Sequence, residues 1–382
     1  MKCLFIALGV YHAVGGVEKF NQRLLRSLSE IRQAEGLLCR VVALWDQPEH
    51  AARAPAGIGF EPCGSRKLVA ALKFCRHAFS SQPDVILYGH LLLAPLAFAA
   101  RLLSPGSRQI LIVHGWEVWR EPFRRRIPLW ERVAVRLGID EVVSVSRLTM
   151  QRMRKAYGLP ESRFRVLPNA VDRPAEVRLG RRERSPGRQI LSVSRLTKGT
   201  LHKGCGEVIQ ALPLVLERFP DVTYHLVGEG ELRPRLEELA EEAGVRRNVQ
   251  FHGRLDDPAL EALYGNVDVF VLPSKKEGFG IVYLEAWKHG LPVIAGNQDA
   301  GAEVVTHGYN GLCVDPDSRE QIAAALIELL SDPQRAARMG QAGRRTVAEQ
   351  YSHEAFRDRL AGILLSGARR RRAAAEWRSE EA

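Results

Sequence analysis

The chain has 382 residues, a formal net charge of +11, and 46% hydrophobic and 26% charged residues, which is typical of a soluble globular protein with room for two domains. The longest apolar run, Leu91–Ala100, is interrupted by Pro95 and is too short to span a bilayer. The six cysteines form neither a CxxC pair nor a Cys/His cluster, so neither a zinc site nor a disulfide framework is predicted.

Residues 1–172 alternate short apolar runs with longer amphipathic stretches. We predict strands at CLFIALGV, CRVVALW, DVILYG, QILIVHG and EVVSVS. The N-terminal segment is too brief for a signal peptide, so we interpret it as the first strand. We predict helices at VEKFNQRLLRSL, SRKLVAALKFCRHAF and RLTMQRMRKAYG. Alternating strands and helices form a parallel sheet covered on both faces, so this half is predicted to be a Rossmann-like domain.

Residues 173–187 interrupt this alternation with charge, proline and glycine and are predicted to be a linker. The alternation restarts in residues 188–350, with strands at QILSVS, VTYHLVG, VQFHG, VDVFVLP, LPVIAG and GLCVD and helices at GEVIQALPLVLERF, ELRPRLEELAEEAG and SREQIAAALIELL. The predicted fold class is α/β, with two doubly wound parallel-sheet domains whose strand ends face each other across a cleft. Residues 351–382 are helical in character, and we expect them to pack back toward the N-terminal domain and to fray at their end.

The stretch KKEGFGIVYLEA, residues 275–286, follows the predicted strand Asp268–Pro273 and leads into a predicted helix. A helix start exposes N–H groups and the positive end of a dipole, so Gly278–Gly280 suit a phosphate. Glu285, deeper in the helix, is a candidate acceptor for ribose hydroxyls, and Glu277 for the hydroxyls of a sugar. The alternative is that Glu277 is an ordinary carboxylate at a helix N-terminus and Glu285 a solvated surface charge.

A cationic pair lies at the first strand-to-helix junction of the second half. Arg195 closes the strand, and Lys203 immediately precedes the predicted helix. A guanidinium and an ammonium suit a diphosphate, because their charge-assisted hydrogen bonds strengthen as a leaving group gains charge. The intervening LTKGTLH contains a competing lysine, Lys198; we prefer Lys203 because Gly204 and the helix follow it directly.

Three other positions of the first half follow predicted strands. Gly16 lies in a second glycine loop at a helix start, and His114 lies where the fourth strand ends. Asp46 follows the second strand and is a candidate acid for a dinucleotide's ribose. The structural alternatives are a tight turn at Gly16 and a hydrogen-bonding role for His114.

The sequence Asp315-Pro316-Asp317 mimics a metal-binding DxD motif. It precedes the predicted helix SREQIAAAL, where Asp317 or Ser318 is the expected N-cap. We therefore predict no metal site there. No metal is needed if Arg195, Lys203 and the helix dipole neutralise the charge of the diphosphate.

Four motifs together carry a family resemblance: SRL…KG at Ser194–Gly204, GEG at Gly228–Gly230, PNAVD at Pro168–Asp172 and EGFGIVYLE at Glu277–Glu285. With them, nearly the whole chain resembles the retaining nucleotide-sugar glycosyltransferases of family 4, which have the GT-B fold. The resemblance implies transfer of a hexose from GDP-mannose or a UDP-sugar to a hydroxyl of a glycan or lipid-linked acceptor, in cell-surface polysaccharide or glycolipid synthesis. It implies no cofactor.

The resemblance also implies roles for individual residues. Arg195 and Lys203 would bind the donor phosphates and stabilise the departing diphosphate. Glu285 would hold the ribose hydroxyls, Glu277 the sugar hydroxyls, and His114 would contact the sugar near the reaction centre. Backbone groups would complete the donor site at Gly278, Phe279, Gly280, Arg254, Leu255 and, from the other domain, Gly16.

The positive charge suggests an anionic partner. Arginine runs occur at Arg124–Arg126, Arg181–Arg184 and Arg369–Arg372, and most of these residues are explained equally well as solvated faces of a basic protein. Aromatic residues are not interleaved with these runs as stacking on nucleic acid would require, so a nucleic-acid partner is disfavoured. The segment Trp119–Trp130, WREPFRRRIPLW, suits an anionic membrane surface, and we expect a cytoplasmic protein that docks on the inner face of the cytoplasmic membrane. A non-catalytic partner subunit remains the alternative function.

Overall fold

In this computed structural model, the main chain is described for every residue except 116, 118, 120–126, 174–186 and 381–382. The chain divides into two compact units, which are treated separately below. Unit 1 comprises Met1–Ala170 with His353–Ala382, and unit 2 comprises Val171–Ser352. The linker expected at residues 173–187 falls almost entirely outside the described residues.

Unit 1 is built on a seven-stranded parallel sheet with the order β3-β2-β1-β4-β5-β6-β7. The central strand β1 pairs with β2 and β4, so that Phe5 lies opposite Val41 on one side and Leu87 on the other. The five strands predicted from sequence are present; β3 and β7 were not predicted. The strands are β1 (Lys2–Ala7), β2 (Leu38–Ala43), β3 (Ile58–Pro62), β4 (Val85–Tyr88), β5 (Arg108–Val113), β6 (Glu141–Ser144) and β7 (Phe164–Val166).

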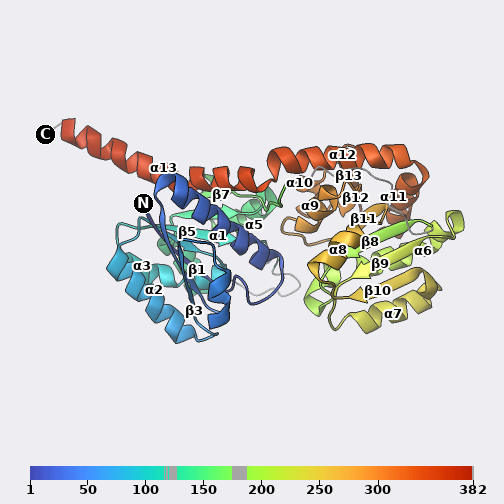
Figure 1. Cartoon of the computed structure of the whole chain (residues 1–382), viewed down its shortest axis with the longest axis horizontal. Helices are drawn as coiled ribbons and strands as arrows, with labels where there is room; N and C mark the ends of the chain where they lie inside the picture. Colours follow the sequence, from blue (N-terminus) through green and yellow to red (C-terminus); the bar gives the residue numbers. More distant parts are fainter. Residues whose placement is uncertain (116, 118, 120–126, 174–186, 381–382) are drawn as a thin grey trace. The chain divides into compact units, whose positions relative to one another are not determined.

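Helices cover both faces of this sheet (Figure 1). Side chains of α2, α3, η4 and α5 share one buried apolar cluster with the sheet, including Phe74, Ala97, Val135 and Met153. The helices of unit 1 are α1 (Gly16–Glu35), α2 (Lys67–Ser81), α3 (Leu96–Leu103), α4 (Leu129–Val133), the π-helix η4 (Ala134–Gly138), α5 (Arg147–Tyr157) and α13 (His353–Glu380), with short 3-10 turns η1 (Pro48–Arg53), η2 (Leu91–Leu93) and η5 (Glu161–Arg163).

The C-terminal helix α13 packs against α1 within unit 1. Phe20 of α1 meets Phe356 of α13 edge to face, with ring centroids 5.3 Å apart. The His353 ring also bonds the Glu30 carboxylate at 2.9 Å. α13 extends as a helix to Glu380. The fraying expected at its end stays a prediction.

Unit 2 repeats the architecture with a six-stranded parallel sheet of order β10-β9-β8-β11-β12-β13. All six strands were predicted from sequence. They are β8 (Gln189–Val193), β9 (Thr223–Val227), β10 (Val249–Gly253), β11 (Val269–Leu272), β12 (Val293–Gly296) and β13 (Gly311–Val314). The helices are α6 (Cys205–Arg218), α7 (Arg233–Glu242), α8 (Asp257–Tyr264), α9 (Ile281–Lys288), α10 (Gly301–Val304), α11 (Arg319–Ser331) and α12 (Pro333–Gln350), with 3-10 turns η6 (Lys198–Lys203) and η7 (Arg246–Asn248).

Two independent parallel sheets therefore confirm the fold class predicted from the alternation of strands and helices. All six cysteines are free thiols. Within the part of the chain that the structure describes, every helix is too short or too polar to cross a bilayer.

Candidate functional site

The loops after β8 and β11 are tied together, because these two strands are neighbours in the sheet of unit 2. The Lys275 N–H donates to the His202 carbonyl at 2.8 Å, and the Ser274 hydroxyl donates to the same carbonyl at 3.2 Å. Gly204 has a left-handed φ of +83°, and a Cβ there would lie 2.4 Å from the Pro273 carbonyl oxygen. Only glycine permits this approach, which brings the SRL…KG segment against the start of KKEGFG.

Lys203 and Glu277 form an ion pair across these two loops. Their side chains are only 19% and 15% exposed, so the pair is shielded from solvent more than an ordinary surface pair. Asp299, after β12, accepts hydrogen bonds from the Glu277 N–H at 2.6 Å and the Gly301 N–H at 2.8 Å. Three neighbouring strand ends thus deliver one cation and two carboxylates to one place.

Burial shifts the protonation of two groups in this cluster. Burial and the negative charge of Glu277 raise the pKa of Asp299 to about 7, although two backbone N–H bonds oppose the shift. Burial and the adjacent Lys203 charge lower the pKa of His202 to about 4. His202 is therefore neutral at pH 7, and Asp299 changes charge near that pH. Neither residue was identified from sequence, because neither stands in a recognisable motif.

Two helices begin beside Lys203 without a side-chain cap. Gly204 precedes α6 and Gly280 precedes α9; both glycines adopt left-handed conformations and, having no side chain, cannot cap the helix that follows. By contrast, Asp256 caps α8 and Ser318 caps α11. The positive ends of α6 and α9 are thus left for another acceptor, and a phosphate is the ligand that such ends favour.

The remaining residues of the EGFG segment have different surroundings. Glu285 is half-buried on α9 and accepts a 3.4 Å hydrogen bond from the Tyr264 hydroxyl. Phe279 is only 4% exposed, and its ring meets Tyr351 edge to face at 5.5 Å. The Phe279 side chain belongs to the core of unit 2, so only its backbone can serve a ligand.

The GEG segment has a structural explanation. A Cβ on Gly228 would lie 1.7 Å from the Ser194 carbonyl oxygen, and Gly230 is packed similarly against Leu196. The Leu196 N–H donates to the Glu229 carbonyl at 3.0 Å. These glycines hold the SRL loop in place and thereby fix the backbone from which the exposed Arg195 side chain projects.

The two candidate lysines of this loop differ. Lys198 is exposed, and its N–H donates to Glu231 at 2.8 Å, whereas the Lys203 ammonium is turned toward Glu277. Arg254 and Leu255 follow β10, where the Gly253 carbonyl accepts a 2.9 Å bond from Gly228. The predicted donor residues of unit 2 therefore follow the ends of β8, β10 and β11.

In unit 1 the predicted residues Gly16 and His114 also follow strands. Gly16 is the first residue of α1, and a Cβ there would meet no atom within 4 Å, so the fold itself does not require glycine. A ring nitrogen of His114 lies 3.1 Å from the Gly89 carbonyl, and its ring meets Phe20 edge to face.

Asp46, a candidate ribose acid from sequence, has a structural role. Its buried carboxylate accepts 2.7 Å bonds from the N–H groups of Val10 and Tyr11, and a His50 ring nitrogen lies 3.1 Å away. Both oxygens are thus engaged by the loop after β1. The interpretation of Asp46 as a ligand-binding acid is wrong.

The Asp315-Pro316-Asp317 sequence forms a helix start. Ser318 caps α11, accepting from the Gln321 N–H at 3.2 Å, which confirms the expected N-cap. Asp317 instead pairs with Lys275 at 2.6 Å. Among the described residues, no group of three or more His, Cys, Asp or Glu side chains could hold a metal ion.

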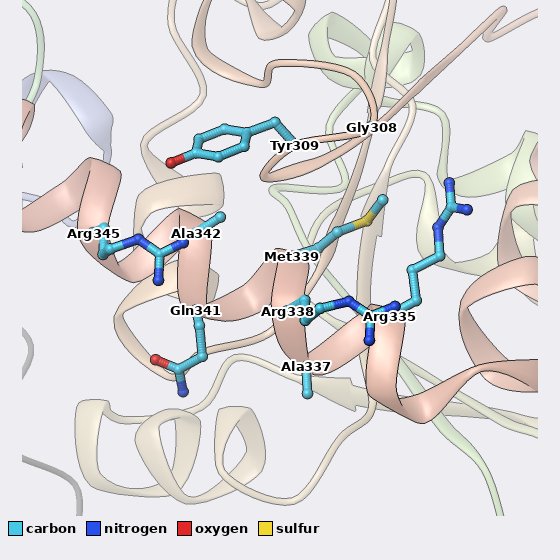
Figure 2. Close-up of a pocket in the computed structure, with 9 residues that line it drawn as sticks. All are labelled: Gly308, Tyr309, Arg335, Ala337, Arg338, Met339, Gln341, Ala342 and Arg345. Carbon is cyan, nitrogen blue, oxygen red and sulfur yellow. The ribbon is translucent and has the colours of Figure 1, made fainter.

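A cavity of about 660 Å³ lies elsewhere in unit 2, between α12 and the loop before β13 (Figure 2). Arg335, Arg338 and Arg345 line it from α12, and Tyr309 lies on the loop side. None of the predicted site residues lines this cavity.

Three basic segments considered from sequence lie wholly or partly outside the described residues. Within Trp119–Trp130, residues 120–126 lie outside the described residues, as do Arg181–Arg184. The side chains of Arg369–Arg372 also lie outside the described part.

Two doubly wound parallel sheets define a two-domain α/β protein, and a lysine and two glycine-preceded helix starts follow neighbouring strands of the second sheet. The model of the family "Glycosyl transferases group 1" matches residues 180–346, and that of "Glycosyltransferase Family 4" matches residues 14–173. The chain belongs to the group 1 and family 4 glycosyltransferases, with the GT-B fold.

Named relatives share this family. The GDP-mannose-dependent alpha-(1-6)-phosphatidylinositol monomannoside mannosyltransferase of Mycobacterium tuberculosis is 36% identical over 291 residues, covering 71% of this chain and 73% of the relative. The GDP-mannose-dependent monoacylated alpha-(1-6)-phosphatidylinositol monomannoside mannosyltransferase of Corynebacterium glutamicum is 33% identical, covering 72% of this chain and 74% of the relative. The crystal structure of Anabaena HepE in complex with UDP covers 96% of this chain and 100% of its own, with a TM-score of 0.75 and 20% identity, a likeness that shows the fold.

Proposed function

We propose that this chain transfers a mannosyl residue from GDP-mannose to a hydroxyl of a lipid-linked acceptor, with retention of anomeric configuration and without a metal ion. The observation that carries the proposal is the cluster formed by Lys203 and the uncapped starts of α6 and α9 in unit 2. The choice of donor and acceptor rests on the relatives, whose names specify GDP-mannose and phosphatidylinositol mannosides.

The donor diphosphate is the group that this cluster suits. Lys203 lies two residues before the start of α6 and pairs with Glu277, which lies four residues before the start of α9, and Arg195 lies on the same loop as Lys203. As the bond between the anomeric carbon and the diphosphate oxygen breaks, negative charge grows on that oxygen. Fixed N–H dipoles and cations stabilise this charge without reorganising, which lowers the barrier. Because the protein itself supplies this positive charge, we propose that no metal ion is required.

The two glutamates take different parts of the donor. Glu285, four residues inside α9, accepts hydrogen bonds from ribose hydroxyls. Glu277 accepts hydrogen bonds from the sugar, and its pairing with Lys203 holds its carboxylate in place. The acceptor oxygen attacks the anomeric carbon on the face that the diphosphate leaves, and the acceptor proton passes to a diphosphate oxygen. This route retains the configuration without a protein nucleophile.

A donor panel tests the proposal. The full chain is heated with GDP-mannose, GDP-glucose, UDP-glucose or UDP-N-acetylglucosamine, and the shift in melting temperature is measured. A ligand at a hundred times its Kd stabilises by about 2.7 kcal/mol, so GDP-mannose should raise the melting temperature clearly. Glu285→Gln should remove the shift, whereas Glu261→Gln, a carboxylate of the neighbouring α8, should keep it. Stabilisation by none of these donors would contradict the proposal.

Transfer itself is measured with a phosphatidylinositol mannoside acceptor. NMR of the product should show an α-mannoside, the configuration of the donor. The rate should be unchanged by EDTA. A β-linked product would contradict retention, and loss of transfer in EDTA that Mg²⁺ or Mn²⁺ restores would contradict metal independence.

A further inference from the structure

One helix layer of unit 1 has an unusually apolar outer surface. It consists of α2 and α3, which lie side by side (Figure 1), and of η4, which packs against α3; all three share a buried cluster with the sheet. Most of the exposed large apolar side chains in the described structure lie on this layer or on the segments adjoining it. Scattered exposed apolar residues are ordinary, but a cluster of them marks an interaction surface.

The apolar residues of α2 form a stripe along the helix. Leu68 is 81% exposed, Leu72 71% and Phe79 66%, and their spacing places them within about 40° of one another around the helix axis. On the neighbouring α3, Leu102 is 84% exposed, and Phe98 lies one turn before it. α2 thus buries one apolar face in the core of unit 1 and presents a second one outward.

The exposed charge on this layer is cationic, and nearby carboxylates are already paired: Glu61 with Lys73 and His77 of α2, and Asp140 with Arg101 of α3. Lys67 and Arg76 are exposed on α2, and Arg136 is exposed on η4. Neither α2 nor α3 contains an acidic residue. The only acid between residues 63 and 104 is Asp84, whose carboxylate accepts a bond from the Lys2 N–H at 2.8 Å. A surface with outward leucine and phenylalanine beside exposed cations is complementary to an anionic bilayer, because the headgroups meet the cations and the acyl region takes the apolar side chains.

We propose that the outer surface of α2, α3 and η4, which we call the α2–α3 surface, docks unit 1 onto an anionic membrane. This goes beyond the transfer reaction, since it assigns a second binding surface that does not use the donor site. This surface is not the Trp119–Trp130 segment that the sequence suggested for membrane docking, because its side chains come from α2, α3 and η4. A membrane fits better than a second copy of this chain, because two such basic surfaces would repel each other.

The test is sedimentation of the full chain with vesicles of phosphatidylcholine alone or with 30% phosphatidylglycerol, without any nucleotide sugar. The native chain should partition to the anionic vesicles. The triple variant Leu68→Ser/Leu72→Ser/Phe79→Ser should partition at least about tenfold less. Lys67→Gln/Arg76→Gln should weaken binding about fivefold per residue at low salt. The matched controls are Tyr309→Ser and Arg338→Gln/Arg345→Gln, at the basic cavity of unit 2, and should bind as the native chain does.

Melting curves and size-exclusion chromatography accompany these measurements. The serine variant should melt as the native chain does, because the replaced side chains are outward. Absence of binding by the native chain, or equal binding by the serine variant, would overturn the proposal. Loss of vesicle binding in the Arg338→Gln/Arg345→Gln variant alone would also overturn it. The same holds if size-exclusion chromatography showed a native dimer that the serine variant converts to monomers. Donor-induced stabilisation is measured separately. Failure of vesicle binding therefore leaves the proposed transfer reaction intact, and failure of donor stabilisation leaves the proposed membrane docking intact.

Discussion

The ion pair between Lys203 and Glu277 allows stability and catalysis to be separated by experiment. Lys203→Met keeps most of the side chain and removes its charge, which leaves the Glu277 carboxylate shielded and without its cation. An exposed pair contributes about 0–1 kcal/mol, whereas breaking a fully buried pair costs about 3–5 kcal/mol. With side chains 19% and 15% exposed, we expect Lys203→Met to lower the free energy of unfolding by about 2 kcal/mol.

The same variant should slow transfer by more than its loss of stability explains. Removing one preorganised donor to a developing negative charge costs about 2.7–4 kcal/mol, or roughly 10²–10³ in kcat. Urea unfolding measures the stability, and steady-state transfer from GDP-mannose at a temperature where the variant is folded measures kcat. Lys198→Met is the matched control, because Lys198 is exposed on the same loop, and it should change neither quantity.

The double variant Lys203→Met/Glu277→Gln completes the cycle. Removing both charges should recover most of the lost stability, because no unpaired charge remains. The rate should stay low. Suppose instead that the double variant regained the stability and transferred sugar as fast as Glu277→Gln alone, and therefore faster than Lys203→Met. Lys203 would then serve only to neutralise Glu277. That result would refute our reasoning, as would loss of activity in Lys198→Met.

Four further predictions concern single positions. The folded pKa of Asp299 is about 7 and its ordinary value is 3.8, so folding takes up a proton between these values and stability falls as pH rises through that window. Asp299→Asn should remove about 3 kcal/mol of this fall between pH 4.5 and 7.5, as measured by urea unfolding. Gly280→Ala should destabilise by about 1–3 kcal/mol, because its φ is +90° and the new Cβ would lie 2.3 Å from the Tyr283 ring, whereas Gly16→Ala should melt no lower than the native chain but raise the donor KM. Asp46→Ala should lose about 2–4 kcal/mol in urea unfolding, since two buried N–H groups lose their acceptor; an unchanged unfolding midpoint would show that the loop after β1 does not depend on it.

The fold was largely predictable from sequence, because each long apolar run alternates with an amphipathic stretch. The strands that were missed are weakly patterned. β3 contains glycine, glutamate and proline in IGFEP, and β7 has only three residues. α3 was missed because Pro95 interrupts the apolar run, although proline is tolerated at a helix start and α3 begins directly after it.

The candidate site was predictable only in part. The juxtaposition of Lys203 and Glu277 follows from two motifs on neighbouring strand ends, and sequence reasoning identified both residues. Asp299 was missed because its importance comes from burial beside Glu277, which only the packing of β12 next to β11 reveals. Asp46 was misassigned for the converse reason, since a carboxylate after a strand is equally suited to bind a ligand or a loop. The outward apolar stripe of α2 also depended on the structure, because sequence periodicity does not say which face is covered.

Hydrogen exchange with and without GDP tests the central claim most directly, since it reports which backbone N–H groups the diphosphate engages. Our account predicts slower exchange at the starts of α6 and α9, around Cys205 and Ile281, and loss of this protection in Lys203→Met. Protection confined to the α12 cavity around Arg338, or no change at either helix start under saturating GDP, would contradict it.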